Sequence, residues 1–249
     1  MSYYYVYDEF VQDPKFEREL AFIETRLTDL GVGGKIARLA LFRDPTELIR
    51  DEVRKGAQTI VAVGNDVTFR KVIDAVADSG VAIGIIPLGK DANFIADMLG
   101  VPTGVASCDV ISARIIQEVD IGVVNGLRFL HQLHIEQGSA CRVLCDNKFT
   151  ISLKRKAALE IRNLALADND VPAANPTDGK LEIVIRTHRG GWFSRTATET
   201  TRVPVEEALI ECTKPVILRA DGEAFEASEF RLSVIPNRIR LITGKDRKF

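Results

Sequence analysis

The chain has 249 residues, of which 46% are hydrophobic and 27% are charged, and its net charge is -2 with an isoelectric point near 6.0. This balance is typical of a globular protein with one large or two modest domains. The charge balance argues against a nucleic-acid partner, and no apolar stretch reaches the ~20 residues of a membrane span. The N-terminus lacks the pattern of a signal peptide, and the four cysteines are expected to be reduced thiols, so we expect a cytoplasmic location.

Strand and helix patterns alternate through the first half of the chain, with short connections between them. Apolar periodicity and turn residues predict helices over 15–30, 45–55, 67–79, 92–99 and 107–118, and strands over 36–42, 59–63 and 81–86. Repeated strand–helix units of this kind are typical of a parallel, doubly wound sheet. We therefore predict an α/β nucleotide-binding domain over residues 1–119.

The pattern changes at about residue 120. Strands are predicted over 119–124, 127–135, 149–156, 159–166, 181–187, 215–220, 230–235 and 238–242, with a two-residue turn at Asn125-Gly126. Only Val205–Cys212 looks helical. The second half, residues 120–249, is therefore predicted to be a β-rich domain, with a β-sandwich as the expected architecture.

Two polar turns carry most of the functional information. Gly64-Asn65-Asp66-Val67-Thr68 and Pro87-Leu88-Gly89-Lys90-Asp91-Ala92-Asn93 each follow a buried apolar run and precede a helical pattern. In an open α/β sheet both turns would lie at the carboxyl ends of parallel strands. Ligands bind there because helix N-termini and free backbone N–H groups converge on that edge.

Further segments follow these turns in an order that resembles a known family. They are Val119-Asp120-Ile121-Gly122, Asn125-Gly126-Leu127-Arg128-Phe129, Pro176-Thr177-Asp178-Gly179-Lys180-Leu181-Glu182-Ile183 and Ala220-Asp221-Gly222-Glu223. Together with the two turns, they resemble the diacylglycerol kinase catalytic domain in its bacterial lipid kinase form. The resemblance implies ATP-dependent transfer of a phosphoryl group to a lipid hydroxyl, with ATP and Mg²⁺ required and with transient contact to a membrane surface.

The resemblance also implies roles for individual residues. The nucleotide phosphates would be lined by Gly64, Asn65, Thr68, Gly89, Lys90 and Asn93. Asp66, Asp120 and Glu223 would be the catalytic acids, with Glu223 the preferred base, and Asp178 would hold a cation. Plainer alternatives remain open: Lys90 as an exposed loop lysine, and Glu223 and Asp178 as ordinary turn residues.

The chain also departs from the family pattern. Asn65 and Val67 stand where the family has glycines, which would matter if the turn needed a left-handed backbone. The N-terminal N-P-x-x-G turn has no match and falls near Tyr7–Phe10, and the stretch 138–148 is too short for the family's helical cap. These departures leave two alternatives open: a nucleotide- or lipid-binding module without catalysis, and a kinase for a water-soluble substrate. The oligomeric state is left open.

The tip formed by Gly190-Gly191-Trp192-Phe193 is flanked by Arg186, Arg189 and Arg195. Aromatic and basic residues together could touch an anionic membrane surface, and a simple hairpin turn is the alternative.

Overall fold

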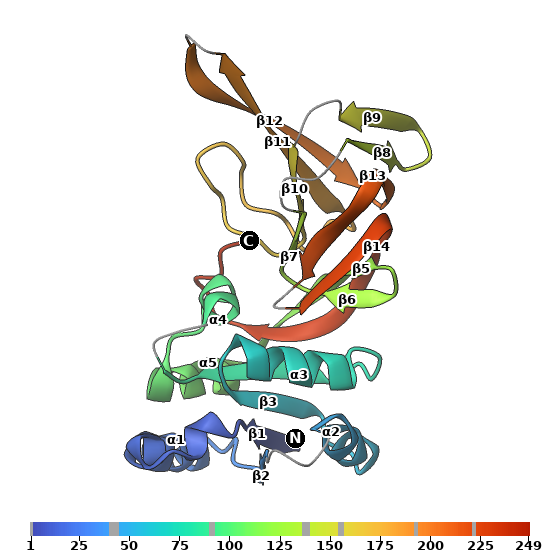
Figure 1. The fold of residues 1–249 in the computed structure, drawn as a ribbon. Coiled ribbons are helices and arrows are strands. Elements are labelled where there is room, and N and C mark those ends of the chain that lie inside the picture. Colours follow the sequence, from blue (N-terminus) through green and yellow to red (C-terminus); the bar gives the residue numbers. More distant parts are fainter. Residues whose placement is uncertain are drawn as a thin grey trace. The chain divides into compact units, whose positions relative to one another are not determined.

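The computed structural model describes residues 2–39, 45–89, 93–135, 140–153, 157–191, 194–220 and 223–249, with the backbone alone for 188–191, 194–198 and 223. The chain divides into two compact units, one made of Met1–Val119 with Arg238–Lys248 and the other of Asp120–Asn237 (Figure 1). Sequence analysis placed all residues from 120 onward in the β-rich domain. The structure returns Arg238–Lys248 to the first unit, because Arg240 and Leu241 pair in parallel with Ala82 and Ile83.

The first unit is built on a parallel sheet, as predicted. The strands β1 (Tyr3–Tyr7), β2 (Lys35–Arg38), β3 (Thr59–Gly64) and β4 (Ala82–Pro87) lie in the order β2-β1-β3-β4, and the end of β14 (Glu223–Thr243) lies beyond β4. The strand β1 was not predicted from the sequence, because its tyrosines carry polar hydroxyl groups. Two of these hydroxyl groups are satisfied at the edge of the core: the Tyr5 hydroxyl donates to the Val32 carbonyl at 2.5 Å and the Tyr7 hydroxyl to Glu24 at 3.2 Å.

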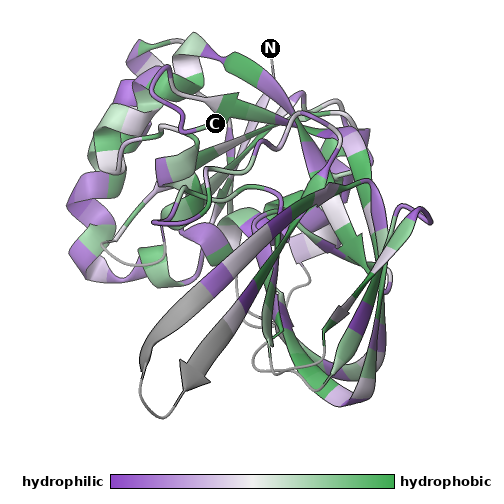
Figure 2. Cartoon of the chain, turned by 90° about the horizontal axis from the view of Figure 1, so that it is seen from above, coloured by the Kyte–Doolittle hydropathy of each residue, from purple (hydrophilic) through white to green (hydrophobic). Residues whose placement is uncertain are grey.

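Helices pack on this sheet with their apolar sides inward (Figure 2). They are α1 (Glu17–Asp29), α2 (Pro45–Arg54), α3 (Asp66–Val76), α4 (Phe94–Met98) and α5 (Ser107–Ala113), with short 3₁₀ turns η1 (Phe10–Gln12), η2 (Pro14–Phe16) and η3 (Gly104–Ala106). Helices α1 and α5 share one buried cluster with Tyr3, Tyr5 and Tyr7, whereas α3 packs against β3 and β4 outside that cluster. The predicted helix over 107–118 is too long. Arg114 takes a left-handed backbone with φ 50°, and β5 begins at the next residue.

The second unit is made of antiparallel strands. They are β5 (Ile115–Val124), which enters from the first unit, β6 (Leu127–Phe129), β7 (Gln132–Ile135), β8 (Cys141–Cys145), β9 (Phe149–Leu153), β10 (Ala157–Arg162), β11 (Leu181–Gly191), β12 (Ser194–Val205), β13 (Glu207–Ala220) and the greater part of β14. The order β12-β11-β10-β7-β13-β14 forms the main path, β8 pairs with β13 and β9, and β5 pairs with β6 and β14. The β5–β6 connection is the predicted Asn125-Gly126 turn, with φ 48° and 85°.

Two predictions for the second unit are wrong. The segment Val205–Cys212, predicted to be a helix, ends β12 and begins β13, where Ala208 and Ile210 are buried between more exposed neighbours. That period of two is typical of a strand with one buried face. The two runs predicted near the C-terminus form the single long strand β14.

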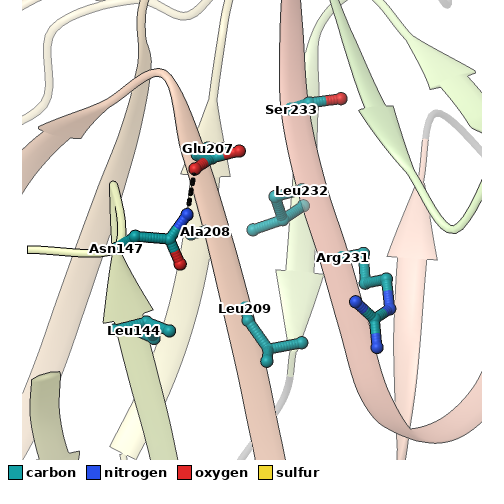
Figure 3. A pocket seen from close by; sticks show the side chains of 8 residues that line it. All are labelled: Leu144, Asn147, Glu207, Ala208, Leu209, Arg231, Leu232 and Ser233. Carbon is teal, nitrogen blue, oxygen red and sulfur yellow. Dashed lines mark hydrogen bonds between the residues drawn. The ribbon is translucent and has the colours of Figure 1, made fainter.

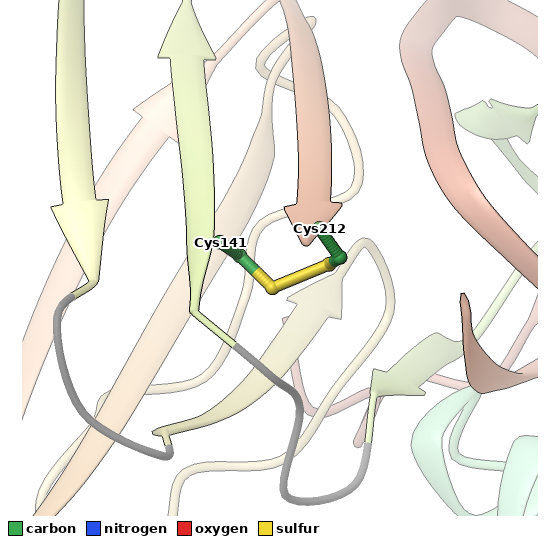
Figure 4. The surroundings of a disulfide bond; sticks show 2 residues. All are labelled: Cys141 and Cys212. Carbon is green, nitrogen blue, oxygen red and sulfur yellow. A yellow bond between two sulfur atoms is a disulfide. The ribbon is translucent and has the colours of Figure 1, made fainter. Parts of the chain in front are cut away.

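A disulfide joins β8 to β13 (Figure 4). Cys141 lies directly opposite Cys212 in the antiparallel register, with their Cα atoms 4.2 Å apart. The expectation of four reduced thiols is therefore wrong for this pair, because 71 residues of intervening chain fold back to bring the two cysteines together. Cys108 and Cys145 are free and buried, and burial raises the pKa of the Cys108 thiol to about 11.

Candidate functional site

The two polar turns lie side by side. Strands β3 and β4 are parallel neighbours in which Gly64 pairs with Pro87, and the Leu88 N–H donates to the Gly64 carbonyl at 2.7 Å. Both turns therefore leave the sheet at the same carboxyl edge of the first unit. This is the arrangement on which the sequence interpretation depends.

The first turn is a helix cap. The Asn65 side chain accepts hydrogen bonds from the N–H groups of Val67 and Thr68 at 3.0 and 3.3 Å, and the Thr68 hydroxyl accepts one from the Asn65 N–H at 3.2 Å. This capping box fixes the start of α3. Asn65 has φ -129° and Val67 lies inside the helix, so neither residue takes the left-handed backbone that a glycine at its position would permit.

Asp66 connects the first turn to the helix that follows the second. Its two carboxylate oxygens accept the Ile95 N–H at 3.1 and 3.2 Å, and Ile95 lies in the first turn of α4. A carboxylate at a helix N-terminus satisfies a backbone donor and interacts favourably with the helix dipole. The acid of the first turn therefore helps to hold the two turns together.

The second turn is described at both of its ends. Gly89 has φ 83°, a conformation that side-chain-bearing residues rarely adopt, and the Asn93 amide donates to the Gly89 carbonyl at 2.9 Å. The other Asn93 amide atom, Oδ1, is buried and has no hydrogen-bond partner among the residues that the structure describes. Such an acceptor is one that a ligand could satisfy. Lys90 lies outside the described residues.

Sequence analysis missed two residues at this edge, Asp8 and Lys71. Asp8 directly follows β1, is 8% exposed, and its Oδ2 accepts the Thr68 hydroxyl at 2.8 Å and the Lys71 ammonium at 3.3 Å. The signal that could have located Asp8 is its place after a run of apolar and aromatic residues. Tyr7 pairs with Val63, so Asp8 leaves the sheet where the first turn does.

An open pocket of about 550 Å³ lies in the first unit, near the second turn. It lies where β1 and β2 end and is lined by Glu9, Phe10, Gln12, Lys15 and Leu39, among others. The Phe10 ring lies 4.0 Å from the position that a side chain on Gly89 would occupy. One lining residue of the pocket therefore lies beside the second turn.

The remaining predicted residues lie in the second unit. Asp120 is fully buried, and both of its carboxylate oxygens are engaged: Oδ2 accepts the Gly179 N–H at 2.7 Å and Oδ1 accepts the Asn237 N–H at 2.8 Å. Burial raises the pKa of Asp120, and these two hydrogen bonds lower it only in part. Its two oxygens therefore hold the backbone at Gly179 and Asn237 within its own unit, and its catalytic role stays a prediction.

Asp178 is exposed, and its Oδ1 accepts the Lys180 N–H at 3.0 Å in a local turn. Over the part of the chain that the structure describes, no three histidine, cysteine, aspartate or glutamate side chains gather into a possible metal site. The role of Asp178 as a cation ligand together with backbone carbonyls stays a prediction. Glu223 is the first residue of β14 and pairs with Ala220 of β13. Its side chain lies outside the part of the chain that the structure describes.

A second, shallow pocket of about 300 Å³ lies on β8, β13 and β14 of the second unit (Figure 3). Leu144, Leu209 and Leu232 are among its lining residues, and Asn147 donates to Glu207 at its rim. None of its residues was predicted to act in the site, and the polar pair at the rim is mutually satisfied. This pocket therefore adds no group to the edge formed by the two turns.

Comparison with known proteins identifies the segment that carries the two turns. Residues 6–124 match the diacylglycerol kinase catalytic domain. The resemblance inferred from the motifs is thus confirmed at the level of the family. The matched segment contains β3, β4, both turns and Asp120, so the described edge of the first unit lies inside it.

Individual relatives agree with this family. The chain is 32% identical over 90 residues to a protein named probable lipid kinase YegS-like from Pseudomonas aeruginosa, and 26% identical over 120 residues to the diacylglycerol kinase of Bacillus subtilis. These alignments cover 35% and 47% of this chain, and 30% and 39% of the two relatives. The chain thus matches only about a third of the length of these curated relatives.

The fold likeness extends further than the sequence likeness. A crystal structure of a diacylglycerol kinase from Bacillus anthracis superposes with a TM-score of 0.82 at 16% identity, covering 99% of this chain and 98% of that one. At this identity the likeness shows the fold, with its parallel α/β part and its antiparallel strands. Among the described residues, no helix has both the length and the apolar character to cross a membrane.

Proposed function

We propose that this chain transfers the γ-phosphoryl group of ATP, bound as its magnesium complex, to a hydroxyl group of a lipid such as a diacylglycerol. One observation carries the proposal: the two turns lie together at one carboxyl edge, joined through Asp66 and Ile95, inside the segment that matches the kinase family. Edges of this kind receive phosphates because backbone N–H groups and helix N-termini converge there.

The described residues of this edge fit a nucleotide in three respects. At Gly64 a side chain would come within 2.3 Å of the Thr68 hydroxyl, so only a bare backbone fits there. The Oδ1 of Asn93, which has no partner among the described residues, can accept from a ribose hydroxyl or an amino group but not from a phosphate oxygen, and the pocket lined by Phe10 has room for a base or a sugar. We assign the phosphates to the two turns and the nucleoside to this pocket.

In the proposed reaction, the oxygen of the acceptor hydroxyl forms a bond to the γ-phosphorus. The bond between that phosphorus and the oxygen bridging to the β-phosphate breaks, and ADP leaves with the electron pair. We assign the hydroxyl proton to the carboxylate of Glu223. Magnesium that arrives with ATP neutralises charge on the phosphates.

Asp66 and Asp120 take different parts in this proposal. We assign Asp66 to the phosphate edge, where it keeps the two turns in register. We assign Asp120 to positioning, because its oxygens hold the N–H groups of Gly179 and Asn237 and the residue is fully buried. This assignment leaves Glu223 as the proposed base.

The first experiment measures binding and transfer separately. Calorimetry with ATP and magnesium tests the nucleotide site, and transfer of labelled γ-phosphate to diacylglycerol in mixed micelles tests the reaction. Binding together with labelled lipid is the expected result. Binding without transfer to any lipid would favour a non-catalytic module, and transfer to a water-soluble polyol in place of lipid would favour a soluble substrate. Absence of ATP binding would refute the proposal.

Variants then test the assigned residues. Asp66→Ala removes the acceptor for the Ile95 N–H that keeps the two turns in register, so we expect this variant to lose transfer. Glu223→Gln should lower kcat by about 10²–10⁴-fold, the range for losing a general base. Asp109→Asn is the matched control, because this exposed acid pairs with Arg26 on the helical side of the first unit. Unchanged turnover in either test variant would refute that residue's role.

A further inference from the structure

The described edge contains an internal anion beside the proposed phosphate site. The Asp8 carboxylate holds two of the groups that a phosphate would use, the Thr68 hydroxyl at 2.8 Å and the Lys71 ammonium at 3.3 Å. Asp8 is 8% exposed, so this carboxylate is fixed among its partners rather than extended into solvent. Lys71 is the cation that pairs with it, and its side chain is 42% exposed.

We propose that Asp8 makes this site selective for metal-complexed nucleotide over free nucleotide. The inference rests on the proposed function and concerns the form of ATP that the edge accepts. Its starting point is that the phosphates must approach donors that Asp8 already engages.

The approach of a triphosphate to this edge is opposed by charge. Metal-free ATP carries roughly four negative charges and its magnesium complex roughly two, so a fixed carboxylate repels the free form more strongly. A second carboxylate, Asp66, lies on the same edge, at the start of the same helix as Lys71. Asp8 and Asp66 thus place two carboxylates beside Lys71 at this edge, which favours a ligand that brings its own cation.

Competition for donors acts in the same direction. The Asn65 N–H donates to the Thr68 hydroxyl, which donates in turn to Asp8, so the single hydroxyl proton that a phosphate would need is already used within the protein. Lys71 keeps two further ammonium protons, but the Asp8 carboxylate already offsets its charge, so its attraction for a phosphate is weakened. A nucleotide whose phosphates already contact magnesium has less need of that ammonium.

Two substitutions shift this selectivity in opposite directions. Asp8→Asn keeps an oxygen that accepts from Thr68 but removes the charge and releases Lys71, so free ATP should bind about tenfold or more tightly, while the magnesium complex changes about threefold at most. Lys71→Met leaves Asp8 without its cation, so free ATP should weaken more than the magnesium complex does. Asp74→Asn is the charge-matched control, because that acid pairs with Arg70 on α3.

The test is calorimetry on the full chain at low salt, with ATP plus EDTA and with ATP plus excess magnesium. The measured quantity is the ratio of the two dissociation constants, which a purely structural role of Asp8 would not change. We expect the ratio to fall in Asp8→Asn, to rise in Lys71→Met and to stay constant in Asp74→Asn. If wild-type protein binds neither form, the proposed function itself fails. If it binds ATP and the ratio moves in neither test variant, the role of Asp8 is refuted and the proposed function stands.

Discussion

Replacing Asp120 with alanine should destabilise the protein strongly, whatever its effect on activity. The substitution removes the acceptor for two buried backbone donors, the N–H groups of Gly179 and Asn237, which lie 2.7 and 2.8 Å from the carboxylate. A hydrogen bond to a charged group stabilises a fold by about 1.5–3 kcal/mol, so the pair contributes about 3–6 kcal/mol. The substitution also removes the unfavourable burial of the carboxylate. We therefore expect the free energy of unfolding to fall by about 2–4 kcal/mol.

The pH dependence of this effect follows from the pKa of Asp120. Burial raises that pKa in the folded protein above its ordinary value of 3.8, so the ionised form is less favoured there than in the unfolded chain. The contribution of Asp120 to stability is thus complete below the unfolded pKa and decreases as pH rises through the folded pKa. The difference between wild type and Asp120→Ala should therefore be larger at about pH 4 than at about pH 7.

Urea unfolding followed by circular dichroism measures both effects. The control is Asp178→Ala, because Asp178 is exposed and accepts the Lys180 N–H within its own turn, and we expect it to lose about 0.5–1 kcal/mol. A loss below about 1 kcal/mol for Asp120→Ala would show that its two hydrogen bonds do not stabilise the second unit. A difference that grows with pH would show that the sign of the pKa shift is wrong.

Three further predictions concern other parts of the chain. Cys212→Ser removes the disulfide to Cys141, which closes a loop of 71 residues, and should lower the free energy of unfolding in urea by about 2–4 kcal/mol. As an internal check, reduced wild-type protein should lose the same amount of stability as the variant, both measured against oxidised wild type. Gly64→Ala places a methyl group within 2.3 Å of the Thr68 hydroxyl and should weaken ATP binding about tenfold or more by calorimetry; unchanged affinity would place the phosphates elsewhere. Cys108, whose thiol pKa is raised to about 11 by burial, should resist alkylation at about pH 8 until the protein unfolds, and mass spectrometry of the native protein would reveal any early reaction.

The parallel sheet and its two turns could be predicted from local sequence. The strands before Gly64 and Pro87 are short, apolar and bounded by turn residues, and α3 begins with a capping pattern that involves Asn65 and Thr68. These signals are local because a buried strand and a helix cap are each specified within a few residues. The family resemblance followed from the order of such local motifs along the chain.

Other features depended on contacts between distant residues. The helix predicted over Val205–Cys212 is a strand because β8 and β14 supply its neighbours, and helix propensity gives way to this pairing. The placement of Asp120 shows the same limit. The motif around Asp120 predicts that an acid stands at this position. The N–H groups that bind its oxygens belong to Gly179 and Asn237, which are 59 and 117 residues away in sequence, so no local pattern could predict them.

Sequence by itself determined the alternation of strands and helices around the two turns, the edge at which the turns emerge and the family whose motifs they carry. Tertiary structure alone decided which polar groups meet at that edge. Asp8 and Lys71 come together with Thr68 because β1 lies beside β3 in the sheet, and strand order is set by packing over the whole unit. Local patterns fix where a side chain leaves its strand, and only the folded sheet fixes which charge lies opposite it.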